Sequence, residues 1–263
     1  MRFVRRHLLT VYAILAFAYL LVPIGVVILF SFNDPAGRYN YTWQGFTLDH
    51  WRNWNGVPGL SDAMVLSIEI ALVASIVATA LGTLIALALV RYGFRGRGAT
   101  NLLIFLPMAT PEIVLGASLL TLFININIFL GFTTILIAHI MFCISYIVVT
   151  VKARLIGFDR SLEEAAMDLG ANEWTTFRKV TLPLIAPAIL AGALLSFALS
   201  VDDFVITYFN SGSEITFPLF VWGAARVGAP PQVNVMGTMI FVVAISLMTI
   251  NILLERRREA RTA

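Results

Sequence analysis

The sequence contains few charged residues and a single cysteine. Only 13% of its 263 residues are charged, whereas soluble domains carry about 25%, so the chain has too few charges to cover a globule in water. Cys143 lies in an apolar run and has no partner for an internal disulfide, which excludes a disulfide-stapled fold. The composition, 59% hydrophobic, therefore indicates a protein of the membrane.

The sequence also lacks the motifs of common nucleotide-binding and catalytic sites. No stretch matches the G-x-x-x-x-G-K-[ST] loop that binds nucleotide phosphates, and the 3 histidines do not stand in a Ser/His/Asp motif. His139 and Cys143 lie four residues apart, on one face of a helix, with no third ligand nearby. We favour a packed polar contact between helices over a metal site there, and we expect neither an enzyme nor a cofactor.

Long apolar runs occupy most of the chain. A helix needs about 20 apolar residues to cross a bilayer. We predict an all-α integral membrane protein, with one transmembrane domain over residues 1–263 and a loop at 152–183. The first run is longer than the core of a signal peptide and lacks a cleavage pattern, so we expect it to be retained. The six predicted spans are residues 8–32, 65–90, 102–124, 131–151, 184–207 and 233–254.

The basic residues fix the predicted orientation. Most of the 18 Lys and Arg residues lie at the two termini, after the second span or in the loop at 152–183. Only Arg38, Arg52 and Arg226 fall in the opposite loops. Because cytoplasmic loops are enriched in Lys and Arg, we place both termini and the loop at 152–183 in the cytoplasm. The aromatic-rich loop after the first span is then external, and suits either an interfacial belt or a docking surface for an external partner.

The stretch "EAAMDLGANEWTTFRKVTLPLIAP" within the cytoplasmic loop is polar and forms helix. Ser161 and Glu164 fit a capping box, which predicts a helix start. Ala165 and Ala166 make one face of this helix flat, and Gly170 stands where a left-handed C-cap is needed. Because acidic residues disfavour anionic lipid, we favour docking of a protein partner over packing on lipid or on the chain's own bundle.

A second short helix is expected directly after the glycine. Asn172 can cap its start, and the helix then continues to about Lys179. Pro183 suits the first turn of the fifth span. The whole element is therefore predicted to be helix, glycine turn and helix, exposed on the cytoplasmic side.

The spacing of this stretch resembles the EAA signature of ABC importer permeases. Glu-Ala-Ala at 164–166, Gly170, Val180 and Leu-Pro at 182–183 match, and only Val180 departs, since the family usually has Ile there. The resemblance implies the type I importer permease fold and a coupling helix that fits a groove on an ATP-hydrolysing subunit. The residues to which it gives this coupling role are Glu164, Ala165, Ala166, Asp168, Gly170, Leu182 and Pro183.

The resemblance also implies partners and a location. Expected partners are a dimer of ATP-binding cassette subunits, a second homologous permease, an extracytoplasmic binding protein and membrane lipid, with no nucleic acid. The expected location is the bacterial cytoplasmic membrane. Further motifs, among them "VRYGFRGR", "LPMATPEIVLGASLL" and "ALSVDDFVI", resemble permeases of spermidine/putrescine importers, in particular the second permease of that system. Permeases for other organic cations or amino-acid-like solutes share parts of these motifs.

Three acidic residues at membrane level are candidates for the substrate pathway. Glu112 follows Pro107 and Pro111 in the third span, where the prolines disfavour a straight helix, and Asp202 and Asp203 end the fifth. Carboxylates there favour a cation such as a polyamine, although the two aspartates also fit a solvated helix end. A secondary transporter or channel is the alternative from another class, but it predicts inverted repeats or a buried proton relay, and we find neither.

Overall fold

A computed structural model describes residues 2–37 and 39–262, without the side chains of residues 2–7, 247–248 and 250–262. Arg38 and the basic side chains of the termini, which carry part of the orientation argument, lie outside the described side chains, so the cytoplasmic termini stay a prediction. Helices make up most of the described chain, and its one β-bridge joins Asn33 and Phe46.

The long helices lie where the apolar runs predict them. The first is α1 (Arg2–Phe30), the second α3 (Leu60–Arg91) and the fourth α6 (Phe132–Ile156). The chain from 173 to 202 is long and apolar enough to cross a membrane as well. The last is α12 (Pro231–Thr262), whose apolar part among the described residues is 231–246. The remaining elements are α2 (Asp49–Arg52), α4 (Arg97–Ala109), α5 (Glu112–Asn125), α7 (Ser161–Asp168), α8 (Glu173–Thr176), η1 (Phe177–Thr181), α9 (Leu182–Asp202), α10 (Val205–Asn210) and α11 (Phe217–Val227).

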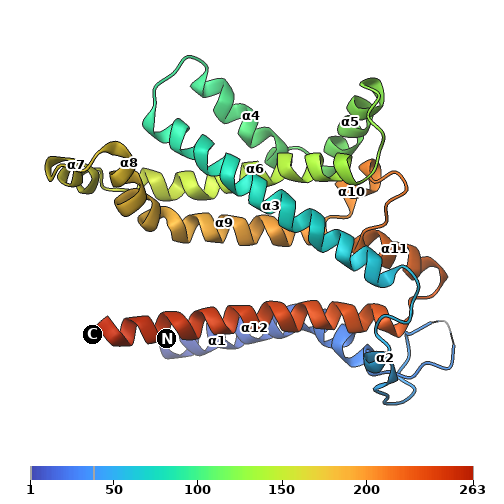
Figure 1. Cartoon of the computed structure of the whole chain (residues 1–263). Coiled ribbons are helices and arrows are strands. Elements are labelled where there is room, and N and C mark those ends of the chain that lie inside the picture. The colour runs from blue at the N-terminus through green and yellow to red at the C-terminus, as the bar shows by residue number, and fades with distance from the viewer. Residues whose placement is uncertain (1, 38, 263) are drawn as a thin grey trace. The chain divides into compact units, whose positions relative to one another are not determined.

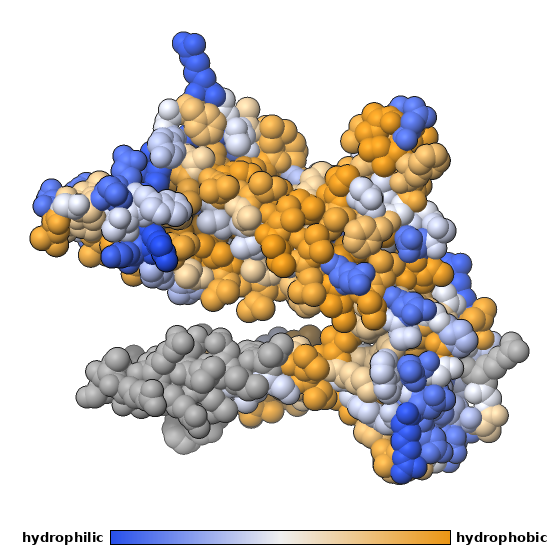
Figure 2. Space-filling view, viewed as in Figure 1, coloured by the Kyte–Doolittle hydropathy of each residue, from blue (hydrophilic) through white to orange (hydrophobic). Residues whose placement is uncertain are grey.

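The chain forms two compact units. One unit consists of residues 1–61 and 221–263 and contains α1, α2 and α12, with α1 and α12 side by side (Figure 1). The other consists of residues 62–220, and α6 runs through it alongside α9, with α4 and α10 also packed on it (Figure 1). Apolar side chains cover much of its visible surface, while hydrophilic ones gather around α7 and α8 (Figure 2). This distribution suits a membrane-embedded body with a polar end.

The predicted external loop folds around one buried asparagine. The Nδ2 atom of Asn33 donates to Asn40 Oδ1 at 2.6 Å and to the Thr42 carbonyl at 2.8 Å, and its Oδ1 accepts from the Gln44 N–H at 2.7 Å. The Phe32 ring stacks on Phe46 and Trp51. These contacts give the loop a defined structure. Its aromatic residues still fit either an interfacial belt or a docking surface for an external partner.

The third predicted span is broken, as its prolines indicate. Helices α4 and α5 meet at an angle of 111°. Pro111 lacks an N–H and disfavours helical geometry at the preceding residue, and Thr110 is extended with φ −85° and ψ 133°. Glu112 then begins α5, where the positive end of the helix dipole stabilises its carboxylate.

The fifth span also differs from the predicted 184–207. Helix α9 ends at Asp202, because Asp203 adopts an extended ψ of 122° and its carboxylate accepts hydrogen bonds from Thr207 in the next short helix. At the other end, α8, η1 and α9 follow without interruption, so the second short helix does not end at about Lys179 but continues into the membrane helix. Residues 177–181 form a π-helical turn just before Pro183, whose missing N–H and ring disfavour regular α-helix there.

The caps of α7 correct one prediction and confirm another. The Ser161–Glu164 capping box is wrong: the Ser161 N–H donates to the Asp159 carboxylate at 3.0 Å, so the cap comes from a residue earlier in the chain. At the other end, Gly170 has φ +89°, as its predicted left-handed C-cap requires. The Gly170 N–H donates to Met167 and the Ala171 N–H to Ala166, which is a Schellman motif. Asn172 caps α8 through the Thr175 N–H at 2.8 Å, also as predicted.

Helices α5 and α10 approach closely at Gly116. A Cβ atom there would lie 2.8 Å from Phe209 Cδ2 and 3.4 Å from the Ile206 Cα. We expect Gly116→Val to destabilise the protein by about 1–3 kcal/mol through overpacking, measured as a lower melting temperature in detergent. Gly98→Val is the control, since a Cβ at residue 98 meets nothing within 4 Å. Equal melting temperatures for the two variants would contradict the close approach.

Candidate functional site

The two helix breaks line one cavity of about 280 Å³. It lies where α4 bends into α5 and where α9 ends. Backbone that leaves helical geometry at membrane depth is tolerated where it lines a cavity or is buried in protein, which accounts for both breaks in one place. The residues that line the cavity are Pro107, Glu112, Leu115, Phe142, Tyr146, Leu199, Asp202, Asp203, Phe204, Val205 and Ile206.

The three acidic residues predicted for the substrate pathway all belong to this lining. Glu112 comes from the first turn of α5, Asp202 from the last turn of α9, and Asp203 from the break after it. None of the described residues that line the cavity is basic. Since neighbouring carboxylates repel one another and attract a cation, the cavity is suited to a positively charged solute.

The two aspartates have different environments. Asp202 is exposed. The Asp203 side chain is only 6% exposed and accepts hydrogen bonds from the Thr207 N–H at 2.8 Å and hydroxyl at 2.7 Å. Asp203 therefore has a structural task, capping α10, while the Asp202 carboxylate is available to a solute.

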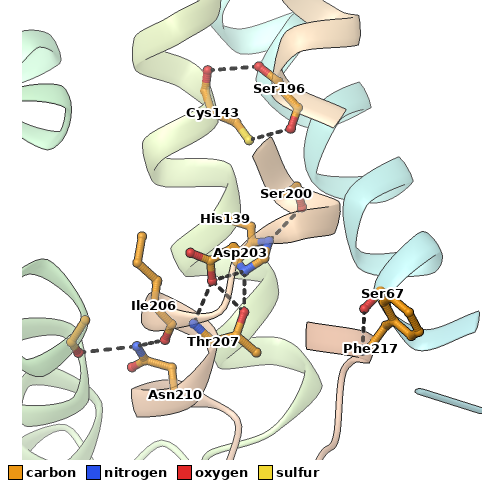
Figure 3. Close-up of polar contacts among 11 residues, drawn as sticks. Ser67, His139, Cys143, Ser196, Ser200, Asp203, Ile206, Thr207, Asn210 and Phe217 are labelled. Atoms are coloured by element: carbon orange, nitrogen blue, oxygen red, sulfur yellow. Dashed lines mark hydrogen bonds and ion pairs between the residues drawn. The ribbon is translucent and has the colours of Figure 1, made fainter. Parts of the chain in front are cut away.

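His139 joins α6 to both sides of the break (Figure 3). Its Nδ1 lies 2.7 Å from the Ser200 hydroxyl, and its Nε2 lies 2.9 Å from the Thr207 hydroxyl and 3.3 Å from the Asp203 carboxylate. One turn along α6, the Cys143 thiol donates to the Ser196 carbonyl at 3.5 Å. The packed polar contact between helices that the sequence predicted at His139 and Cys143 is confirmed.

We expect His139→Ala to destabilise the chain by about 2–5 kcal/mol, the range for emptying a large core position. The substitution also leaves the Ser200 hydroxyl and the Asp203 carboxylate with fewer partners in a buried site. Thermal unfolding in detergent measures the effect. Cys143→Ala on the same helix face is the matched control and should cost much less, because it removes a small side chain with a weak donor. A melting temperature unchanged by His139→Ala would contradict this structural role.

The predicted coupling residues fall into two groups. Helix α7 and its C-cap present Glu164, Ala165, Asp168 and Gly170 on the exposed surface, with Ala166 half-buried. Around them, Leu162 is 48% and Leu169 90% exposed, so an apolar face is uncovered here. Leu182 and Pro183 instead begin α9, directly after the π-helical turn, where they shape the helix rather than extend that face.

Sequence reasoning missed the role of Glu163, the residue next to Glu164 in α7. Glu163 is buried, and its Oε1 accepts hydrogen bonds from Arg91 at the end of α3 and from Thr181 in η1. Burial raises the pKa of Glu163, but the hydrogen bonds from Arg91 and Thr181 and the positive charges of Arg91 and Arg160 together lower it below its ordinary value. The carboxylate is therefore charged at neutral pH. No local spacing reveals this ion pair, because its two residues are 72 positions apart.

The family of the chain follows from its sequence. The family model for the binding-protein-dependent transport system inner membrane component matches residues 78–260, which include the cavity and α7. The chain belongs to this family of inner membrane components. As a member it is a multi-pass protein of the bacterial inner membrane and a non-catalytic transport subunit.

Two curated relatives of this family member are named permeases. It is 40% identical over 254 residues to the spermidine/putrescine transport system permease protein PotC of Haemophilus influenzae, covering 96% of this chain and 98% of that one. It is 39% identical over 239 residues to the putrescine transport system permease protein PotI of Escherichia coli, covering 86% and 83%.

A solved structure shares the fold of this inner membrane component. A chain of a bacterial ABC transporter involved in the import of the acidic polysaccharide alginate superimposes with a TM-score of 0.66 over 97% of this chain and 95% of its own, at 19% identity. The type I importer permease fold is thereby shown. The cargo of that transporter is acidic, so the fold alone carries no information on the charge of the solute.

Proposed function

We propose that the chain is a permease subunit of an ATP-driven importer and forms the membrane pathway for polyamines such as spermidine and putrescine. The observation that carries the proposal is the cavity lined by Glu112, Asp202 and Asp203. Phe142, Tyr146 and Phe204 lie in the same lining, and aromatic faces attract ammonium groups. At about 280 Å³ the cavity lies near the lower limit of ligand pockets, about 300–1,000 Å³, which suits a slender cation.

The proposal includes the partners of the chain. The exposed face of α7, with its EAA residues, would dock on one subunit of an ATP-binding cassette dimer. A dimer offers two such grooves and this chain has one EAA element, so a second homologous permease is needed. An extracytoplasmic binding protein would deliver the solute. The relatives named as polyamine permeases support this assignment of the solute.

Reconstitution of the whole system tests the function. The chain is purified with the products of neighbouring genes, and an ATP-hydrolysing subunit is expected to copurify. In liposomes with the binding protein, uptake of labelled spermidine or putrescine should require ATP. Transport that persists without ATP would instead indicate a secondary transporter or channel. ATP-dependent uptake of another organic cation or an amino-acid-like solute, without polyamine uptake, would keep the importer and replace the solute.

A further inference from the structure

Three side chains hold α7 to the membrane helices. The Glu163 carboxylate is buried beneath α7 and accepts hydrogen bonds on one oxygen, Oε1, from the Arg91 guanidinium and the Thr181 hydroxyl. Arg91 is the last residue of α3, and Thr181 is the last residue of the π-helical turn that leads into α9. One carboxylate thus ties together α7 and the ends of two long helices.

Helix α7 depends on such contacts because it is short. It has 8 residues, and isolated helices shorter than about 12–15 residues are marginal in water. The exposed residues of α7 cannot fix its position relative to the membrane helices. The segment before it, 157–160, is also largely exposed. The ion pair with Arg91 therefore links α7 to α3, and the hydrogen bond from Thr181 links it to the start of α9.

The placement of the three residues has a mechanical consequence. Separating Glu163 from Arg91 would leave the buried carboxylate without its charged partner, which is strongly destabilising. Thr181 adds the start of α9, the helix that ends at the cavity with Asp202. The hydrogen bond therefore connects α7 with a helix that reaches the cavity carboxylates at its other end.

We propose that Arg91, Glu163 and Thr181 form a clamp that makes α7 move as one body with α3 and α9, and that they are positioning residues for energy coupling. The clamp rests on the proposed function, since coupling requires an ATPase on α7. It differs from the exposed EAA face in its task. The exposed face receives the partner, and the buried clamp passes the movement to the pathway.

The test measures solute transported per ATP hydrolysed by the full complex in liposomes with its binding protein. We expect Glu163→Gln to copurify with the ATPase but to transport about ten-fold less solute per ATP, because the neutral amide loses the ion pair with Arg91 and accepts the hydrogen bonds of Arg91 and Thr181 less strongly. Thr181→Val, which replaces the hydroxyl by a methyl group, should act in the same direction, and Thr181→Ser, which keeps the hydroxyl, should retain the wild-type ratio. Glu173→Gln is the matched control, an exposed carboxylate in the same segment. Wild-type ratios in both Glu163→Gln and Thr181→Val would overturn the clamp.

A second measurement separates the clamp from the proposed function. Hydrogen exchange of the α7 amides in the purified chain reports its attachment whatever the solute. We expect faster exchange over residues 161–169 in Glu163→Gln than in Glu173→Gln, and equal exchange overturns the clamp. If Glu163→Gln does not copurify with the ATPase, the solute transported per ATP hydrolysed is compared between Thr181→Val and Thr181→Ser instead. Equal values for these two variants overturn the clamp. A wild-type complex without ATP-dependent uptake refutes the proposed function, while the exchange result still decides on the attachment.

Discussion

Asp202→Asn is expected to lower polyamine uptake by about ten- to a hundred-fold at low solute concentration. Asp202, like Glu112, is an exposed carboxylate of the cavity, and a hydrogen bond to a charged group contributes about 1.5–3 kcal/mol. The loss should be seen mainly as a higher KM for uptake, because the substitution keeps the size of the side chain and removes the charge that attracts an ammonium group. Initial rates of labelled putrescine and spermidine uptake in liposomes measure it.

Two other variants distinguish this effect from general damage. Glu69→Gln removes another exposed carboxylate of the same unit, one that does not line the cavity, and should leave the KM unchanged. Asp203→Asn should lower the melting temperature, since Asp203 caps α10 and contacts His139. An unchanged KM for Asp202→Asn would mean that Asp202 is a solvated helix end, the alternative that the sequence left open.

Much of this fold could be predicted from the sequence, because long apolar runs indicate membrane helices. Hydrocarbon cannot satisfy backbone polar groups, so a run of about 20 apolar residues has few structures available. Pro111 marks the break in the third span for an equally local reason, since proline disfavours helical geometry at the preceding residue, whereas Pro107 lies inside α4 without ending it. The break after Asp202 was not predictable in this way. It depends on the Asp203 carboxylate capping α10, and aspartate at a helix end fits many structures.

The candidate site shows the same limit. The sequence identified Glu112, Asp202 and Asp203 because charge is rare in apolar runs, but it could not tell the exposed aspartate from the capping one. The distinction depends on Thr207 and on His139, which is 64 residues away from Asp203 and reaches it only in the folded chain. Glu163 in α7 is a second residue whose role could not be predicted from the local sequence. It stands beside Glu164 in a polar segment, and only its tertiary contact with Arg91 makes it different.

Gly170→Val is expected to reduce coupled uptake by about ten-fold or to prevent copurification of the ATPase, while the chain still inserts into the membrane. Residue 170 has φ +89°, and no atom lies within 4 Å of a Cβ there, so the cost is one of backbone conformation rather than of space. A left-handed conformation costs an L-residue roughly 1–2 kcal/mol, and more for a β-branched one. The chain can avoid that cost by abandoning the Schellman bonds to Met167 and Ala166, which ends α7 differently and displaces its docking face.

Matched glycine variants make this prediction specific to the backbone. Gly157 lies in the same loop with φ −85°, which valine tolerates. Gly157→Val should therefore transport as much solute per ATP as the wild type. Gly170→Asn should be milder than Gly170→Val, because asparagine adopts the left-handed region more readily. The measurement is the ratio of solute transported to ATP hydrolysed, together with the amount of ATPase that copurifies. If Gly170→Val and Gly157→Val couple equally well, the end of α7 does not position the docking face, and coupling must depend on the clamp and the α7 surface alone.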